Sequence, residues 1–125
     1  MLNLMVDKKR PKRRSRAQEE RLNQAFQALS DPSRRRIVAL LREAEELTVT
    51  DIADAFSMSL NGVSKHLKVL ERAGIVRRRI DGREHWLRVR WEALQAPYEW
   101  LHFYQYFWSG RLDALVDPAA SQNSV

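Results

Sequence analysis

The sequence predicts a mainly α-helical fold with one small β-hairpin, and three observations support this fold class. Apolar residues recur at helical spacing in several stretches after residue 18. Around Asp81-Gly82 the pattern changes to that of two short strands joined by a tight turn. At 125 residues and 44% hydrophobic content, the chain is long enough for one compact domain. We expect that domain to span residues 19–116, between a disordered basic arm over 1–18 and a frayed tail over 117–125.

Helix-start signals predict four helices before the hairpin. Asp31 offers an N-cap directly before Pro32, and proline is favoured at the first helical position. Thr48 and Asp51 have the spacing of a capping box, and Ser59 can cap the helix that follows it. The predicted helices span residues 19–29, a segment starting at Pro32, residues 49–56 and residues 59–73.

Residues 75–90 are predicted to form a two-stranded hairpin, which we call the wing. Gly74 should end the preceding helix, because glycine readily adopts the left-handed conformation that closes helices. A two-residue turn at Asp81-Gly82 would create an ion pair, a cation–aromatic pair and an apolar pair across the strands. These pairs are Arg79 with Glu84, Arg77 with Trp86, and Val76 with Leu87.

The helix over residues 59–73 has one apolar and one polar face. Helical spacing places on the buried side Leu60, Val63, Leu67 and Leu70. The opposite face carries Asn61, Gly62, Lys65, Lys68 and Arg72, with Ser64 and His66 at its two sides. Small residues allow close approach to DNA, while asparagine and lysine reach base edges or phosphates. A polar outer face is equally typical of any solvated helix. The short helix, tight turn and basic hairpin around it favour a winged helix-turn-helix.

Positive charge is concentrated in two segments of the chain. The net charge is +6, yet residues 1–16 alone hold seven basic groups against one acidic group. Residues 59–90 hold nine basic and three acidic groups, and the remaining segments are net acidic. Such polarisation is typical of a domain that presents one face to phosphate. The basic arm is equally compatible with two roles: a solvated tail, or an arm that contacts phosphates or the minor groove of DNA.

A last helix is predicted from Trp91 to about Val116, and it carries most of the aromatic residues. Its apolar residues cover about half of the circumference, more than one neighbouring helix needs. We therefore expect a twofold dimer interface formed by this helix and the first one. The expected interface residues are Leu22, Phe26, Trp100, Phe103, Tyr104, Phe107 and Trp108. The alternative is a small-molecule pocket lined by these rings.

Several functional classes find no support in the sequence. The chain has no cysteine, which excludes disulfides, thiolate metal sites and cysteine nucleophiles. Its four glycines are too scattered for a phosphate-binding loop, and no hydrolase or metalloprotease motif occurs, so we expect no catalytic residues. No stretch approaches the roughly twenty apolar residues of a membrane helix. We expect a soluble, cytoplasmic protein.

The sequence contains FQALSDPSRRRIVALL, LTVTDIA, NGVSKHLKVLERAGIV and the DGRE turn. Together these stretches, within about residues 22–90, resemble the ArsR family of bacterial winged-helix regulators. The resemblance implies a homodimer that binds double-stranded DNA at a pseudo-palindromic operator, usually as a repressor of its own operon. It also implies base or phosphate contacts by Asn61, Ser64, Lys65, His66 and Lys68, with Arg78, Arg79 and Arg83 of the wing near the backbone.

The departures from that family concern metal binding. Metal-sensing members carry cysteines in an ELCVCD motif, whereas this chain has Thr48 and Thr50 at both positions. Other members bind zinc between their last helices through clustered histidines and carboxylates, and only His102 is available there. We expect no metal and no cofactor, and a small-molecule inducer is left open.

Two alternatives to a sequence-specific regulator remain, namely an architectural or non-specific nucleic-acid-binding protein and a protein-interaction module that retains the fold.

Overall fold

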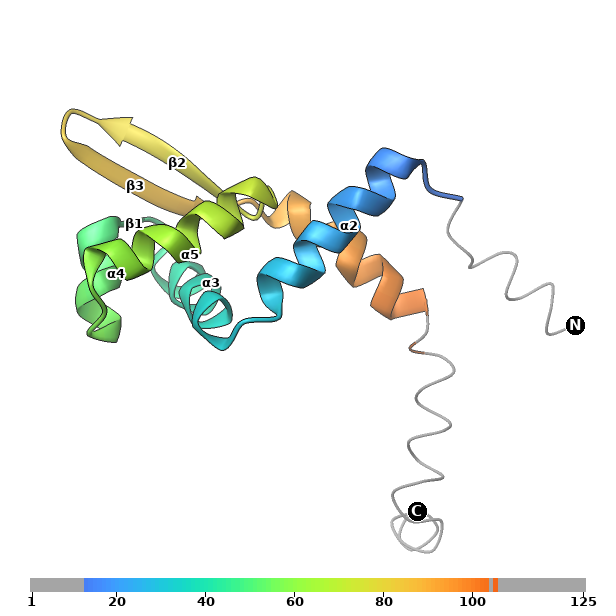
Figure 1. The fold of residues 1–125 in the computed structure, drawn as a ribbon, viewed down its shortest axis with the longest axis horizontal. Coiled ribbons are helices and arrows are strands. Elements are labelled where there is room, and N and C mark those ends of the chain that lie inside the picture. Colours follow the sequence, from blue (N-terminus) through green and yellow to red (C-terminus); the bar gives the residue numbers. More distant parts are fainter. Residues whose placement is uncertain (1–12, 104, 106–125) are drawn as a thin grey trace, which may run out of the picture. The chain divides into compact units, whose positions relative to one another are not determined.

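The computed structural model of the protein describes residues 13–103 and residue 105 (Figure 1). They belong to two compact units, Ser15–Pro97 and a second that includes Tyr98 and the residues after it, and each is described by itself. The first unit contains α2 (Arg16–Leu29), α3 (Pro32–Ala44), β1 (Leu47–Thr48), α4 (Val49–Phe56), α5 (Leu60–Arg72), β2 (Val76–Asp81), β3 (Glu84–Val89) and the 3-10 helix η1 (Trp91–Leu94). This mainly helical fold with a hairpin wing confirms the predicted fold class.

Side-chain caps start α3, α4 and α5 at the predicted residues. Asp31 Oδ2 accepts a hydrogen bond from the Arg34 backbone N–H at 3.1 Å, with Pro32 in the first helical position. Thr48 and Asp51 form both halves of the predicted capping box. The first helix departs from the prediction, because α2 begins at Arg16 rather than at residue 19.

The earlier start of α2 comes from a second capping box that the sequence analysis did not use. Ser15 Oγ accepts from the Gln18 backbone N–H at 3.2 Å, and the Ser15 backbone N–H donates to Gln18 Oε1 at 2.7 Å. Glutamine satisfies this motif as well as glutamate does. Residues 16–18, which were predicted to belong to the basic arm, are therefore helical.

α4 and α5 form the two helices of a helix-turn-helix. The turn between them contains Ser57 in a left-handed conformation, with φ 53°. On α5, Val63, Leu67 and Leu70 are fully buried, as predicted. Leu60 was predicted to join them but is 54% exposed. Helical side chains lean toward the N-terminus, so a side chain at the first position projects beyond the packed turn.

The wing has the predicted strands but a different register. Asp81 faces Glu84, Arg79 faces Trp86 and Val76 faces Val89, so the turn residues are Gly82 and Arg83. The predicted pairs of Arg79 with Glu84, Arg77 with Trp86 and Val76 with Leu87 are wrong. Gly82 has φ +62° while Arg83 does not have a positive φ, which is the pattern of a type II′ turn with glycine first.

The change of register preserves the two faces of the wing. Moving the turn by one residue shifts each pairing by two positions, and strand side chains alternate with a period of two. Val76, Leu87 and Val89 consequently share the buried face. The predicted role of Val76 and Leu87 in the core is confirmed, although they are not opposite each other.

A third short strand completes the sheet, in the order β1-β3-β2. In β1, Leu47 pairs with Leu87 and Thr48 pairs with Trp86, antiparallel to β3. The prediction of a two-stranded wing missed this strand, because two residues are too few to show strand alternation. β1 ties the middle of β3 to the start of α4.

The segment after the wing begins as η1 and continues as an α-helix over residues 95–103. The predicted helix start at Trp91 is therefore a 3-10 turn. The predicted continuation to Val116 lies outside the described residues. Within the described part of the chain, no helix is long and apolar enough to cross a membrane.

Candidate nucleic-acid interface

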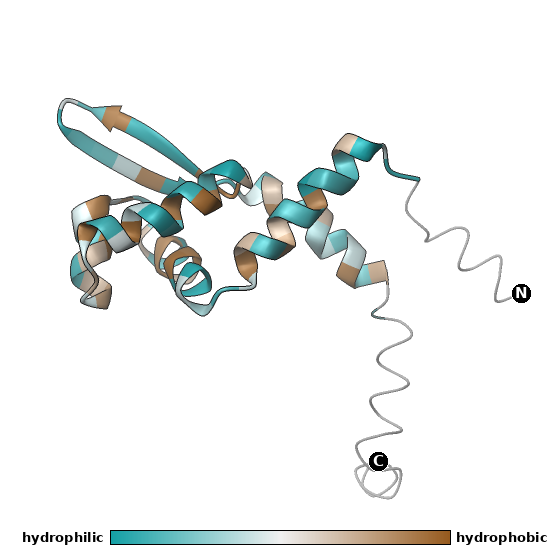
Figure 2. Ribbon diagram, viewed as in Figure 1, coloured by the Kyte–Doolittle hydropathy of each residue, from teal (hydrophilic) through white to brown (hydrophobic). Residues whose placement is uncertain are grey.

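The exposed face of α5 carries a row of cations. Lys65, Lys68 and Arg72 are all exposed and lie three to four residues apart, which places them on one side of the helix. Asn61 is exposed near the start of the same helix. In residues 13–103 the structure places no carboxylate at ion-pair distance from these three cations. Figure 2 shows the hydrophilic and hydrophobic positions interleaved along α5, as expected of a two-faced helix.

The two small residues of this face, Gly62 and Ser64, are less exposed than the cations. Gly62 is half-buried, and its backbone N–H donates to Ser59 Oγ at 3.0 Å to cap α5. A Cβ at position 62 would lie 3.2 Å from that hydroxyl oxygen, which is a tight contact. Ser64 is half-buried beside the exposed row. A larger residue at position 62 would therefore press against the Ser59 side chain that caps α5.

His66 points toward the start of α3 instead of outward. Its Nδ1 lies 3.8 Å from Asp31 Oδ2 and 3.5 Å from Arg34 Nη1. The hydrogen bond from the Arg34 backbone N–H, with the nearby Arg34 and His66 charges, holds the pKa of Asp31 below its ordinary value. His66 therefore joins α5 to α3, and this contact positions the helix.

Arginines also fix α2 against α3. Arg34 Nε donates to the Ala28 carbonyl at 2.6 Å, and Arg35 Nη1 donates to the Leu29 carbonyl at 2.7 Å. Both carbonyls belong to the last turn of α2, where the helix dipole favours positive charge. Since Arg34 also approaches His66, it connects α2, α3 and α5.

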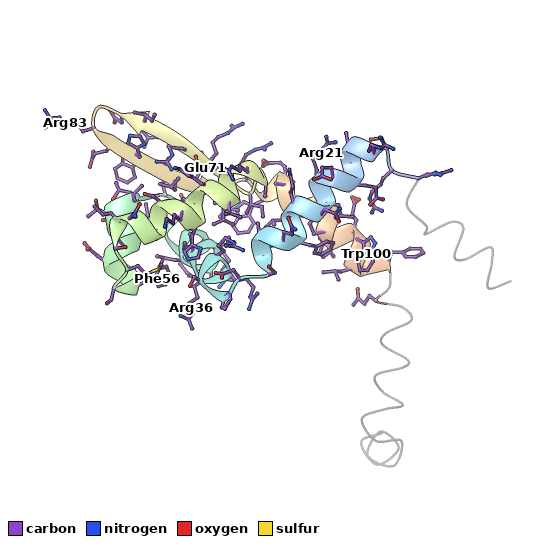
Figure 3. All side chains as sticks on the ribbon, viewed as in Figure 1. Arg21, Arg36, Phe56, Glu71, Arg83 and Trp100 are labelled. Atoms are coloured by element: carbon purple, nitrogen blue, oxygen red, sulfur yellow. The ribbon has the colours of Figure 1, made fainter. Side chains whose placement is uncertain are left out.

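Arg78 is bound inside the angle between the wing and α5. Its Nε and Nη2 donate to the two carboxylate oxygens of Glu71 at 3.1 and 2.8 Å, and its Nη1 lies 3.0 Å from His85 Nδ1. Side-chain exposure is 24% for Arg78 and 28% for Glu71. The Glu71 hydrogen bonds raise the pKa of Arg78. Figure 3 shows Glu71 on α5 close to β2, so this pair holds the wing against the helix.

Arg79 forms the corresponding contact on the outer side of the wing. Its Nε and Nη2 donate to Glu46 at 3.1 and 2.9 Å, and its guanidinium lies 5.6 Å from the Trp86 ring centre. The same hydrogen bonds lower the pKa of Glu46 and raise that of Arg79. A cation–aromatic contact with Trp86 was predicted for Arg77, and the change of register gives it to Arg79. Arg79 thus connects β2 to the segment before β1.

Two exposed arginines of the wing were missing from the predicted site. Arg77 and Arg88 are directly opposite each other on β2 and β3. Like charges in this arrangement are destabilising unless an anion lies between or beside them. The correct register would have revealed the pair. Arg83 is exposed at the tip of the wing, where Figure 3 shows it pointing away from the protein.

The predicted dimer residues are only partly described. Leu22 is 5% exposed within the single chain, so little of its side chain remains for a partner. Phe26, Trp100 and Phe103 are half-buried. The larger exposed apolar side chains of the 95–103 helix are Tyr98 and Leu101, at 64% and 45%. The side chain of Tyr104, together with Phe107 and Trp108, lies outside the described residues.

The positions that correspond to metal ligands in metal-sensing proteins have other contacts here. Thr48 Oγ1 accepts from the Asp51 backbone N–H at 3.1 Å and caps α4. In the second unit, the ring of His102 stacks on Tyr98 and its Nδ1 lies 2.9 Å from Gln105 Oε1. Among the described residues, no group of three or more potential ligand side chains is close enough to hold a metal ion.

Known proteins are similar to this chain in both sequence and architecture. A family described as a helix-turn-helix domain matches residues 29–79. The transcriptional repressor SdpR of Bacillus subtilis is 32% identical over 80 residues, which cover 64% of this chain and 88% of SdpR. The crystal structure of the ArsR family transcriptional regulator RHA00566 is 35% identical, with a TM-score of 0.65, covering 73% of this chain and 93% of that one. The chain belongs to the ArsR family of transcriptional regulators.

A third similarity concerns the fold of this ArsR-family chain. The solution structure of Mb0332 from Mycobacterium bovis has a TM-score of 0.60 at 24% identity, and the match covers 76% of this chain and 92% of that one. That protein is a homodimeric winged helix-turn-helix DNA-binding domain. The comparison confirms the winged helix-turn-helix fold of the first unit.

Proposed function

We propose that this ArsR-family protein is a homodimeric repressor of its own operon that binds a pseudo-palindromic operator. α5 would enter the major groove, and the wing would contact the backbone. The observation that carries the proposal is the exposed row of Lys65, Lys68 and Arg72, which faces outward and has no acidic partner within the described residues. The repressor function of SdpR and the homodimeric state of Mb0332 support it.

The contacts with DNA would be divided between the two elements. Asn61, Ser64 and Lys65 near the start of α5 would reach base edges, and Lys68 and Arg72 would contact phosphates. Arg77, Arg83 and Arg88 would contact the backbone from the wing. Gly62, His66, Arg78 and Arg79 would act indirectly, because their recorded contacts position the helix and the wing.

Twofold symmetry would place two copies of α5 in successive major grooves, about one turn of DNA apart. We propose that Phe26 and the aromatic residues of the last helix supply the interface. A repressor of this kind would work in the cytoplasm, where its operator lies.

Selection of bound duplexes from a random DNA pool at about 0.15 M salt tests the function, since non-specific contacts are weakened there. We expect an inverted repeat with half-sites about one turn apart. Lys65→Ala should relax the preference within each half-site, whereas Arg36→Ala, an exposed arginine on α3, should not. Recovery of no motif, with affinity that depends on salt alone, would contradict the proposal and favour a non-specific nucleic-acid-binding protein.

A further inference from the structure

A cavity of about 330 Å³ lies within the first unit, behind the end of α5. Arginines from three separate segments line it: Arg21 of α2, Arg72 at the last position of α5, and Arg90 after β3. Apolar groups, among them Ala93 and Pro97, also line the wall. The volume falls within the range of small-ligand pockets, about 300–1,000 Å³.

The charges around this cavity are not balanced. Glu92 is the one acidic residue of its lining, with Oε2 3.9 Å from Arg90 Nε and a side chain that is 73% exposed. Within residues 13–103, Arg21 and Arg72 have no recorded hydrogen bond or ion pair. Three guanidinium groups around one opening repel each other, and a bound anion would relieve that repulsion.

One of the three arginines is held in place. The Arg90 backbone N–H donates to the Ile75 carbonyl at 2.7 Å, and Arg90 Nη1 donates to the Gly74 carbonyl at 3.4 Å. Gly74 has φ +76°, so the chain turns sharply here and brings Arg90 next to the end of α5. The guanidinium is therefore positioned before any ligand arrives, which lowers the entropic cost of binding.

We infer that this cavity binds a small organic anion with two acidic groups, carboxylate or phosphate, on a compact apolar skeleton. Planar guanidinium groups recognise both kinds of oxyanion, and the apolar wall suits a carbon skeleton. A DNA phosphate is a poorer occupant, because a duplex presents its phosphates on a convex surface and cannot enter a concave site of this size.

Binding at this place would influence DNA recognition, a consequence that rests on the proposed function. The ligand would contact the last turn of α5, α2 and the segment that leads to the last helix. It would also neutralise Arg72, which belongs to the exposed row. The loss of this positive charge would weaken DNA binding, as expected for an inducer.

The test is calorimetric titration of the full chain, without DNA, with phthalate and separately with inorganic pyrophosphate at low salt. We expect phthalate to bind, and Arg21→Gln or Arg72→Gln to weaken it about tenfold each, which corresponds to about 1.4 kcal/mol. Arg36→Gln is the matched control, since Arg36 is also an exposed helix arginine without a recorded partner in the described residues. It should bind phthalate as the unmodified protein does.

Three results would overturn the inference. The first is that phthalate does not bind, whether or not pyrophosphate does. The second is equal weakening by Arg36→Gln and Arg21→Gln, which would indicate general attraction to positive charge. The third is unchanged phthalate binding by Arg21→Gln and Arg72→Gln. A smaller salt dependence of DNA binding by the same variants, measured separately, would then assign these arginines to DNA. Because the titration contains no DNA, its outcome is independent of whether an operator exists.

Discussion

Arg78 was predicted to lie near the DNA backbone, and from its contacts with Glu71 and His85 we propose instead that it positions the wing. We expect its exchange for methionine to destabilise the free protein through loss of the bidentate pair with Glu71. Charge-assisted hydrogen bonds contribute about 1.5–3 kcal/mol, and exposed ion pairs contribute about 0–1 kcal/mol. With about a quarter of each side chain exposed, we expect a coupling free energy of about 1–2 kcal/mol between the two residues.

A double-mutant cycle measures this coupling directly. Arg78→Met, Glu71→Met and the double variant would be unfolded with urea at one protein concentration, because the stability of the proposed dimer would depend on concentration. In thermal unfolding, each kcal/mol corresponds to about 4–8 °C for a domain of this size. Arg83→Met is the control, since the exposed Arg83 at the wing tip should not affect stability.

The same variants separate a positioning role from a phosphate contact. A lost phosphate contact reduces the slope of log affinity against log salt by about 0.9. Arg83→Met should reduce the slope, whereas Arg78→Met should lower affinity and leave the slope unchanged. A coupling near zero, or a reduced slope for Arg78→Met, would refute the positioning role.

Four further predictions concern the backbone, pH and the arm. Glu45 has φ 68° and lies in a tight turn, in which the Glu46 N–H donates to the Ala44 carbonyl at 2.8 Å. Glycine adopts a positive φ without strain, so Glu45→Gly should raise the free energy of unfolding in urea by about 1 kcal/mol. Gly74→Ala should lower it by about 1–2 kcal/mol, because φ is +76° there. The pKa of Glu46 is lowered in the folded state, so its stabilising effect is complete above the ordinary value of 4.5 and is lost as pH falls through the folded-state value. In acid titrations followed by circular dichroism, Glu46→Gln should lose less stability over that range than the unmodified protein. Deletion of residues 1–14, which keeps the Ser15 cap, should reduce the salt slope of DNA binding if the arm contacts phosphate, and an unchanged slope would exclude that role.

Local signals predicted the helices well because caps act over three or four residues. Asp31 and Thr48 each accept a hydrogen bond from a backbone N–H three residues later, and this spacing is visible in the sequence. The start of α2 was missed for the opposite reason, since Ser15 lies in a run of basic residues that suggested disorder. The capping pair with Gln18 was nevertheless present in the sequence.

The tertiary contacts of the candidate site could not be predicted from the sequence, whereas the helix starts could. The outward residues of α5 follow from helical spacing, and Lys65, Lys68 and Arg72 are exposed as expected. The partners of His66 and Arg79 lie 32 and 33 residues away along the chain, at Arg34 and Glu46. No periodicity within one segment indicates such pairs, so neither partner was predicted.

The distribution of paired and unpaired cations limits how much of the charge can bind DNA. Residues 59–90 hold nine basic groups, and three of them have carboxylate partners, namely Arg78, Arg79 and Arg90. The other six, if all contacted phosphate, would give a salt slope of about 5 per protomer at about 0.9 per contact. A slope above about 11 for the proposed dimer would therefore require cations from outside this segment. The basic residues before Ser15 are the most concentrated source, so the slope of the full chain already indicates whether the arm takes part.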